Sequence, residues 1–465
     1  MNTEKVTLKE KVGYGLGDAA SSMFWKLFGM YLMFFYTDIF GIEAAVVGTM
    51  FLVTRIWDSL FDPIVGVVSD RTESKWGKFR PYLLWVAVPF GVLGVLTFTT
   101  PDFSPTGKIV YAYITYSLMM MVYSLINVPY ASLLGVMSSD PKERTALSSY
   151  RMIFAFLGSI LALILIEPLV KLFGGSGEGA NLTFGWSMTA IVFAVIAVIF
   201  FLCTFSWTKE RIRPIKETGN SLKEDVNDLL VNKPWWILLG AGIAALIFNS
   251  IRDGAAVYYF KYYAIAPDTF DLGIIGSALS LTTIYLVLGQ GANILGILFV
   301  TPVSNRIGKK KTYLFAMLFA TVFSIAFYFV GKDNILLMLI LQVLISACAG
   351  SIFPLLWSMY ADIADYSEWK TGRRATGLIF SSSSMSQKFG WSIGGALTGW
   401  LLAYFGFQAN VEQTVEAQDG IRMMLSFLPA IGTVLSVVFI SLYPLTEQKL
   451  QEITTDLANK RKDQR

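Results

Sequence analysis

The chain has 465 residues, of which 54% are hydrophobic, 15% aromatic and only 15% charged, with a mean hydropathy of +0.57. Soluble domains carry about a quarter charged residues, so this composition excludes an ordinary soluble enzyme; it also excludes a disordered chain, because disorder needs low hydrophobicity. The net charge is a modest +4, and the absence of histidine excludes histidine triads, metal sites and proton relays. Both cysteines, Cys203 and Cys348, lie in apolar runs, which argues against a disulfide framework.

Apolar runs long enough to cross a membrane recur along the whole chain. A spanning helix needs about 20 predominantly apolar residues, so we predict an all-α membrane protein with twelve transmembrane helices. The first 13 residues contain no apolar stretch, so no cleaved signal peptide is expected. The predicted spans cover roughly 14–37, 44–68, 81–101, 109–139, 152–174, 179–208, 234–251, 272–305, 312–331, 335–361, 375–406 and 423–446.

Lysine and arginine are distributed unevenly between the two sides of these spans. Of the 37 basic residues, 28 fall in the N-terminal segment, in every second loop and in the tail, whereas five fall in the other loops. Cytoplasmic loops carry the excess of basic residues, so we predict a multi-pass protein of a bacterial inner membrane with both termini cytoplasmic. Because the basic residues follow the topology, the expected partners are the lipid bilayer and small molecules rather than nucleic acid. We expect a monomer.

The chain divides into two halves with a shared local pattern. Ser69-Asp70-Arg71 follows the second span of the first half, and Ser304-Asn305-Arg306 follows the second span of the second half; each is followed by Gly-Lys. We therefore predict an N-terminal six-helix bundle at 1–207, a cytoplasmic loop at 208–234, a C-terminal six-helix bundle at 235–446 and a tail at 447–465. Two such repeats are the organisation of the major facilitator fold.

Three charged residues lie within the second predicted span. Arg55, Asp58 and Asp62 are spaced by three and four residues, which puts them on one helix face. Two carboxylates one turn apart repel each other unless a cation, a proton or the arginine sits between them. Ionisable groups inside a membrane usually mark a pathway, so we predict a site for Na⁺, Li⁺ or H⁺. The alternative is a structural ion pair between Arg55 and the aspartates.

Polar residues in three other spans favour a binding site. Asp18, Ser22 and Lys26 form a stripe along the first span with Trp25 beside them, a combination that suits a sugar, although the stripe could also face water. In the fourth span, Asn127 could line a cavity opened by Pro129 or bind a neighbouring helix. In the eleventh span, Lys388 calls for a carboxylate partner, for which Asp58 or Asp62 is the natural candidate.

The sequence resembles the glycoside–pentoside–hexuronide:cation symporters, the melibiose-carrier family of the major facilitator superfamily. The resemblance covers essentially the whole chain. It is carried by YGLGD at 14–18, MYLMFFYTDIFG at 30–41, RIWDSLFDPIVGVVSDRTESKWGKFRPY at 55–82, NVPYASL at 127–133, DPKERTALSSYR at 140–151 and ADIADYSEWKTGRRATG at 361–377.

The resemblance implies roles for individual residues. The coupling cation would be bound by Asp58 and Asp62, which would form the metal site if the ion is Na⁺, together with Ser124. Arg151 and Lys388 would serve the sugar site. The sugar-binding aspartates of the melibiose carrier fall on Ser22 and Asn127, and a further cation ligand falls on Phe61. These departures argue against melibiose as the cargo. Na⁺ needs several oxygen ligands, and Phe61 removes one of them. The coupling ion is therefore more readily H⁺, although Na⁺ stays open.

We therefore expect a secondary active transporter that couples sugar or glycoside uptake to an inward gradient of H⁺ or Na⁺, and that is not an enzyme and uses no cofactor. Charged residues at the cytoplasmic corners would gate access; these are Asp70, Arg71, Arg144, Arg306 and Arg373. One alternative is a transporter of the same fold that moves a lysolipid or another amphiphile. A second is a membrane-embedded glycosyl transferase that uses Asp58 and Asp62 as acid and base.

Overall fold

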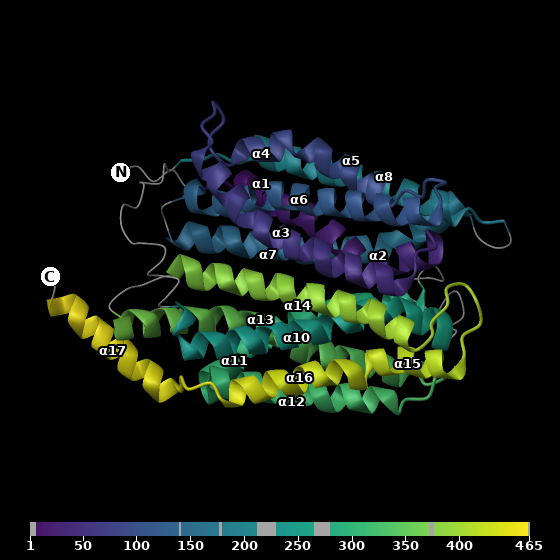
Figure 1. Ribbon diagram of the computed structural model, residues 1–465. Helices are drawn as coiled ribbons and strands as arrows, with labels where there is room; N and C mark the ends of the chain where they lie inside the picture. Colours follow the sequence, from purple (N-terminus) through teal and green to yellow (C-terminus); the bar gives the residue numbers. More distant parts are fainter. Residues whose placement is uncertain are drawn as a thin grey trace. The chain divides into compact units, whose positions relative to one another are not determined.

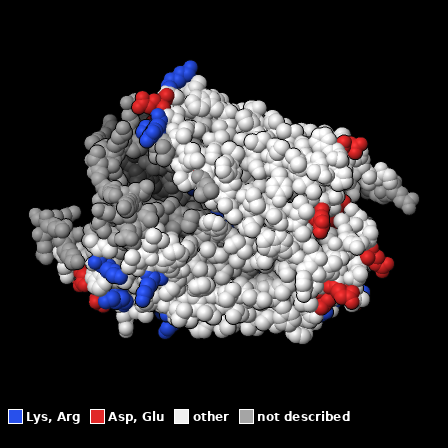
Figure 2. Space-filling view, in the orientation of Figure 1, with Lys and Arg blue, Asp and Glu red and all other residues white. Residues whose placement is uncertain are grey.

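The computed structural model describes residues 6–138, 141–175, 179–211, 229–264, 280–371 and 376–463. Every regular element in these ranges is a helix, so the all-α prediction is confirmed for the described part of the chain. The helices of each unit run alongside one another (Figure 1). Among the described residues, nearly all of the middle of the face seen in Figure 2 is uncharged, whereas the Lys, Arg, Asp and Glu side chains gather towards its two ends. This distribution is the one that a bilayer requires of helices that cross it.

The chain divides into two compact units. The described residues of the first unit fall within 1–216, 265–287 and 399–414, and those of the second fall within 217–264, 288–398 and 415–465. Helices of the first unit are α1 (Leu8–Lys26), η1 (Leu27–Tyr31), α2 (Leu32–Phe34), η2 (Phe35–Ile39), α3 (Ala44–Arg71), α4 (Arg80–Trp85), α5 (Ala87–Thr97), α6 (Pro105–Met137), α7 (Pro141–Gly174) and α8 (Leu182–Trp207).

The remaining helices lie in the second unit, except that the first turns of α11 and the last turn of α14 belong to the first. They are α10 (Lys233–Tyr258), η3 (Tyr259–Tyr263), α11 (Leu281–Ile307), α12 (Lys309–Tyr328), α13 (Ile335–Thr371), α14 (Thr376–Tyr404), α15 (Val415–Leu425), α16 (Phe427–Ser441) and α17 (Glu447–Asp463). The η segments are single π-helical turns, and one ends the first span of each unit.

Each of the twelve predicted spans overlaps a described helical segment, although residues 272–279 of the eighth span lie outside the described residues. Nine of these segments are long and apolar enough to cross a membrane by length and composition. The other three depart from a simple apolar rod. The first span is a chain of α- and π-helical turns, the third breaks at Val86 between α4 and α5, and the eleventh, α14, has a polar N-terminal half. Hydropathy alone therefore locates these spans but does not describe their geometry.

In the first unit, α1 packs against α7 and α8, and α3 packs against α6. The approach of α7 to α1 depends on Gly158, because a Cβ atom there would lie 2.6 Å from the Ala19 carbonyl oxygen. Small residues allow helix backbones to approach this closely in membranes. The close packing brings the polar residues of α1 within reach of those on α7.

A glycine and a carboxylate form the same clasp in both units. Gly77 has a φ of +112° and precedes α4, and the Glu210 carboxylate accepts hydrogen bonds from the amides of Lys78 (2.8 Å) and Arg80 (2.9 Å). Gly308 has a φ of +87° and precedes α12, and Glu447 accepts from the Lys309 amide at 2.9 Å. In each unit, a carboxylate that follows the last predicted span thus caps a helix that follows the shared Gly-Lys pattern.

The clasp predicts the effect of two glycine substitutions. We expect Gly77→Ala and Gly308→Ala each to lower the thermal midpoint of unfolding by roughly 2–8 °C, because an alanine is strained at positive φ. At Gly77, a Cβ atom would also lie 2.5 Å from a Glu210 carboxylate oxygen. Gly66→Ala in α3, where nothing lies within 4 Å of a Cβ, is the control and should leave the midpoint unchanged or slightly raised. Equal midpoints for all three variants would contradict this account.

The start of α1 is held by a capping box. The Thr7 hydroxyl accepts from the Glu10 amide at 3.3 Å, and Glu10 Oε2 accepts from the Thr7 amide at 2.8 Å. Glu10 also forms an ion pair with Arg211 at 2.8 Å. Burial raises the pKa of the Glu10 carboxyl, but the hydrogen bonds from Thr7 and the Arg211 guanidinium outweigh burial, so the pKa lies below its usual range.

The lowered pKa sets the pH range in which Glu10 stabilises the protein. A carboxyl whose pKa is depressed by folding contributes stability above its unfolded pKa, and this contribution is lost as the pH falls through the folded pKa. We therefore expect Glu10→Gln to lower the midpoint of unfolding at neutral pH, with a difference from the wild type that shrinks in acid. Thermal unfolding measured across a pH series checks this, and a difference that does not depend on pH would contradict it.

Candidate substrate and cation site

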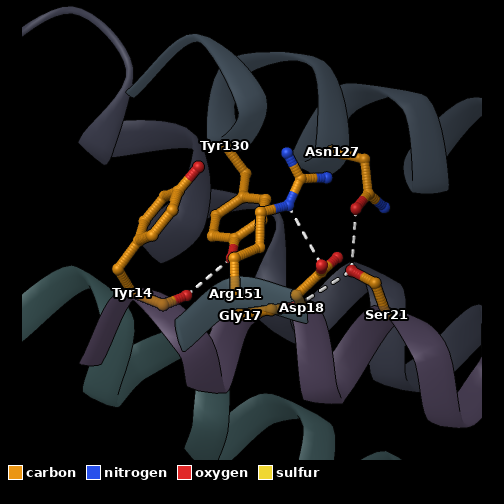
Figure 3. Close-up of polar contacts among 7 residues, drawn as sticks. All are labelled: Tyr14, Gly17, Asp18, Ser21, Asn127, Tyr130 and Arg151. Atoms are coloured by element: carbon orange, nitrogen blue, oxygen red, sulfur yellow. Dashed lines mark hydrogen bonds and ion pairs between the residues drawn. The ribbon is translucent and has the colours of Figure 1, made fainter. Parts of the chain in front are cut away.

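An ion pair links α1 to α7 in the first unit (Figure 3). The Arg151 guanidinium donates from Nε to Asp18 Oδ2 at 3.0 Å, with side-chain exposures of 34% and 16%. The Arg151 guanidinium carbon also lies 5.4 Å from the centre of the Tyr130 ring, which packs on Tyr14 with ring centres 4.8 Å apart. The Tyr130 hydroxyl donates to the Tyr14 carbonyl oxygen at 2.6 Å. The charged pair thus lies beside two buried aromatic rings.

A second polar contact lies next to this pair and joins α1 to α6 (Figure 3). The Ser21 hydroxyl donates to Asn127 Oδ1 at 2.8 Å, and Asn127 Nδ2 donates to the Tyr123 carbonyl oxygen at 2.9 Å. The Ser21 hydroxyl also lies 3.1 Å from the Gly17 carbonyl oxygen. Asn127 therefore binds a neighbouring helix, which is one of the two roles considered for it from the sequence.

The predicted cation residues lie on α3, close to α6. Asp58 is 1% exposed, and its Oδ1 accepts a hydrogen bond of 2.6 Å from the hydroxyl of Ser124, which is 2% exposed. Asp62 lies one turn further along α3 and is half-buried. Two carboxylates and a hydroxyl thus come from two packed helices. Beyond this pair, the described residues contain no group of three or more acidic or cysteine side chains suited to a metal ion.

Arg55 connects the two sets of residues. Its guanidinium carbon lies 4.4 Å from the centre of the Trp25 ring, and the Trp25 ring centre lies 5.7 Å from that of Tyr123. The arginine is 7% exposed, so this cation–π contact is shielded from water. The arginine that the spacing placed beside the aspartates therefore also contacts the aromatic residue of the first span.

The other predicted substrate residues are not part of the contacts described above. Ser22 and Lys26 lie half-buried on α1. Ser21, rather than Ser22, makes the contact with Asn127. Lys388 lies half-buried on α14 in the second unit. Its expected pairing with Asp58 or Asp62 stays a prediction.

The predicted gating residues are described only in part. Arg71 and Arg306 are exposed at the ends of α3 and α11. The side chains of Asp70 and Arg144, and the whole of Arg373, lie outside the described residues. Three residues after Arg306, Lys309 forms an ion pair with Asp362, and its Nζ lies 2.7 Å from Asp362 Oδ2.

Sequence reasoning missed several residues of this site. Tyr14 and Ser21 lie four residues before and three residues after Asp18, a helical spacing that could have placed all three on one face. Tyr130 lies in the NVPYASL motif, but nothing in that motif indicates that its hydroxyl binds the Tyr14 carbonyl. The Tyr31 hydroxyl, which lies 3.3 Å from Glu167 in the fifth span, was also missed.

The residues of the first unit offer the contacts that a polyhydroxylated molecule needs. A carboxylate can accept two hydrogen bonds from neighbouring hydroxyls, and a guanidinium can donate two. An aromatic ring such as that of Trp25 packs against the apolar C–H groups of a sugar. No histidine, metal cluster or activated nucleophile accompanies them among the described residues. The arrangement suits binding better than covalent chemistry.

Comparisons with known proteins show that this all-α chain belongs to the class of membrane transporters. The sequence model described as MFS/sugar transport protein matches residues 13–447. This chain belongs to that family, the glycoside–pentoside–hexuronide:cation symporters of the major facilitator superfamily. It is a multi-pass bacterial inner-membrane transporter and not an enzyme.

Individual relatives cover nearly the whole chain. The inner membrane symporter YicJ of Escherichia coli (strain K12) is 37% identical over 98% of this chain and 96% of its own. The isoprimeverose transporter of Lactiplantibacillus pentosus is 37% identical over 94% of this chain and 89% of its own. A solved structure of a D-xylose-proton symporter superposes with a TM-score of 0.62 at 13% identity, over 94% of this chain and 97% of that one. The predicted major facilitator fold and family are confirmed.

The ion pair between Asp18 and Arg151 predicts coupled mutational effects. We expect Asp18→Asn and Arg151→Gln each to lower the midpoint of unfolding, and the double variant to lose less than the sum, with a coupling free energy of about 1–2 kcal/mol. Asp18→Asn combined with Lys332→Gln, an exposed loop residue, should be additive. Additive losses in the Asp18/Arg151 cycle would show that the pair contributes nothing to stability.

Proposed function

We propose that this protein is a symporter that carries a sugar or glycoside into the cytoplasm together with H⁺ or Na⁺. The observation that supports it best is the contact between Asp58 and Ser124 on packed helices, with Asp62 one turn away. Two carboxylates at this spacing in apolar surroundings favour a bound cation or proton. The relatives named as symporters support the same conclusion.

The cargo half of the proposal is supported by the residues around Asp18. The ion pair with Arg151, the nearby amide of Asn127 and the Trp25 ring supply donors, acceptors and an apolar face. These are the groups that recognise sugars and position them. The isoprimeverose transporter among the relatives points to a glycoside as the first cargo to test.

The two sites lie close enough in the first unit to influence each other. Arg55 lies three residues before Asp58 on α3 and stacks on Trp25 of α1, so a change in charge at Asp58 acts on an arginine that contacts the aromatic residue of the cargo site. We propose that cation binding at Asp58 and Asp62 strengthens sugar binding and that sugar binding strengthens cation binding to the same extent, as thermodynamic linkage requires.

The proposal extends to topology and gating. The uneven distribution of basic residues favours cytoplasmic termini, and the two six-helix repeats favour a rocking motion about a central site. Lys388, to which the family resemblance gives a role in sugar binding, is part of the same proposal. Arg71, Arg306 and the other predicted gating residues would close the cytoplasmic side, and the protein would act as a monomer.

Reconstituted vesicles test the role of the acidic pair. We expect Asp58→Asn and Asp62→Asn to abolish accumulation of a radiolabelled glycoside such as isoprimeverose against its gradient, because the cation no longer adds its driving force. Counterflow, which needs no net driving force, should persist at a reduced rate. Asp102→Asn, an exposed loop carboxylate, is the matched control and should accumulate cargo normally. Full accumulation by the Asp62→Asn variant would refute the coupling role.

Thermal stability identifies the cation and cargo together. A ligand that binds the folded protein raises its unfolding midpoint, and linked ligands raise it together. A panel of sugars measured with and without Na⁺ at two pH values should show a sugar-induced shift that grows with Na⁺ if sodium is coupled. The shift should grow at the lower pH without Na⁺ if the proton is coupled. A sugar shift indifferent to both would contradict coupling.

A further inference from the structure

A polar pocket of about 300 Å³ lies at one end of the first unit, away from the proposed sugar and cation residues. It is lined by the start of α1 and by the segment that follows α8. Three basic side chains and one acidic one face it, namely Lys9, Lys209, Arg211 and Glu10, with the Trp207 ring forming another wall. The proposed transport cycle uses none of these residues.

The acidic residue is already engaged. Glu10 forms the ion pair with Arg211 at 2.8 Å, and its other oxygen closes the capping box with Thr7. The Arg211 amide donates to the Val136 carbonyl oxygen of α6 at 2.8 Å, which holds the segment after α8 against the bundle. The pocket therefore has a fixed wall in which positive and negative charges balance.

The two lysines give the pocket its net charge. Lys9 Nζ lies 5.4 Å from the centre of the Trp207 ring, and Lys209 follows that tryptophan by two residues. Neither lysine has an ion-pair partner among the residues that the structure describes, and both are exposed. The charges of Glu10 and Arg211 neutralise each other, so the pocket presents the two lysine ammonium groups to an incoming ligand.

The position of the pocket indicates which ligand meets it. α8 is one of the most apolar spans, and Trp207 ends it, as aromatic residues do at the membrane–water interface. Lys9 and Lys209 therefore lie at the level of lipid headgroups. Basic pockets at the ends of membrane helices suit anionic headgroups, because phosphate oxygens accept charge-assisted hydrogen bonds from ammonium groups.

We propose that this pocket binds a phosphate-bearing anion and that the headgroup of an anionic phospholipid supplies it. The two ammonium groups bind the phosphate oxygens, and the capping hydroxyl of Thr7 and the Trp207 ring border the rest of the headgroup. The proposal does not depend on the identity of the cargo or of the coupling ion.

Lipid titration followed by native mass spectrometry tests the proposal on the purified full-length protein. We expect phosphatidylglycerol to bind the wild type more tightly than phosphatidylcholine, whose headgroup carries no net charge. The Lys9→Gln/Lys209→Gln variant should bind phosphatidylglycerol about tenfold more weakly or worse, because each lysine near the surface contributes to anionic-lipid affinity. Glycerol 1-phosphate, which carries the phosphate without acyl chains, tests a soluble source of the same anion.

The control is Lys75→Gln/Lys311→Gln. It removes the same charge from exposed lysines that do not line the pocket, and Lys75 lies over Trp76 at 4.5 Å, as Lys9 does over Trp207. This variant should bind phosphatidylglycerol like the wild type. Equal weakening in both variants would mean that only net charge matters, and unchanged binding by the Lys9/Lys209 variant would also overturn the proposal. A further outcome is that glycerol 1-phosphate binds as tightly as the lipid and that this binding is lost in the Lys9/Lys209 variant. That result would show a phosphate site but would contradict the lipid as the source of the phosphate.

Discussion

The candidate site depends on the cost of placing a charge among apolar helices. An isolated charge in such surroundings is expensive, so each charged side chain must find a partner before the helices can pack. Arg151 meets this requirement through Asp18, and Asp58 meets it in part through the Ser124 hydroxyl. Each contact crosses from one helix to another, so the residues suited to binding also hold the first unit together.

The same requirement explains why sequence patterns located so much of the protein. Apolar runs identified every span because the bilayer admits few alternatives to a long apolar helix. Asp58 and Asp62 stood out because carboxylates within such a run are rare. Arg55 was placed on the face of Asp58 by spacing alone, and the structure adds that its guanidinium lies over Trp25 of another helix.

The contacts between spans could not be predicted from the sequence patterns. The contact between Ser21 and Asn127 was not predicted, because which of two adjacent serines faces α6 depends on the rotation of α1, which hydropathy does not determine. The pairing of Tyr130 with the Tyr14 carbonyl joins residues 116 positions apart, and no periodicity within one helix encodes it. The π-helical turns of the first span in each unit also escaped notice, since they leave the apolar pattern intact.

The repeated pattern of Gly-Lys after the second span of each half turned out to carry a structural reason that charge alone did not suggest. In each unit the glycine with positive φ lets backbone amides donate to a carboxylate that follows the last predicted span. These hydrogen bonds join positions 132 residues apart in the first unit and 138 residues apart in the second. Each closure encloses several long helices, so the chain of each unit is held as a ring rather than as an open row of helices.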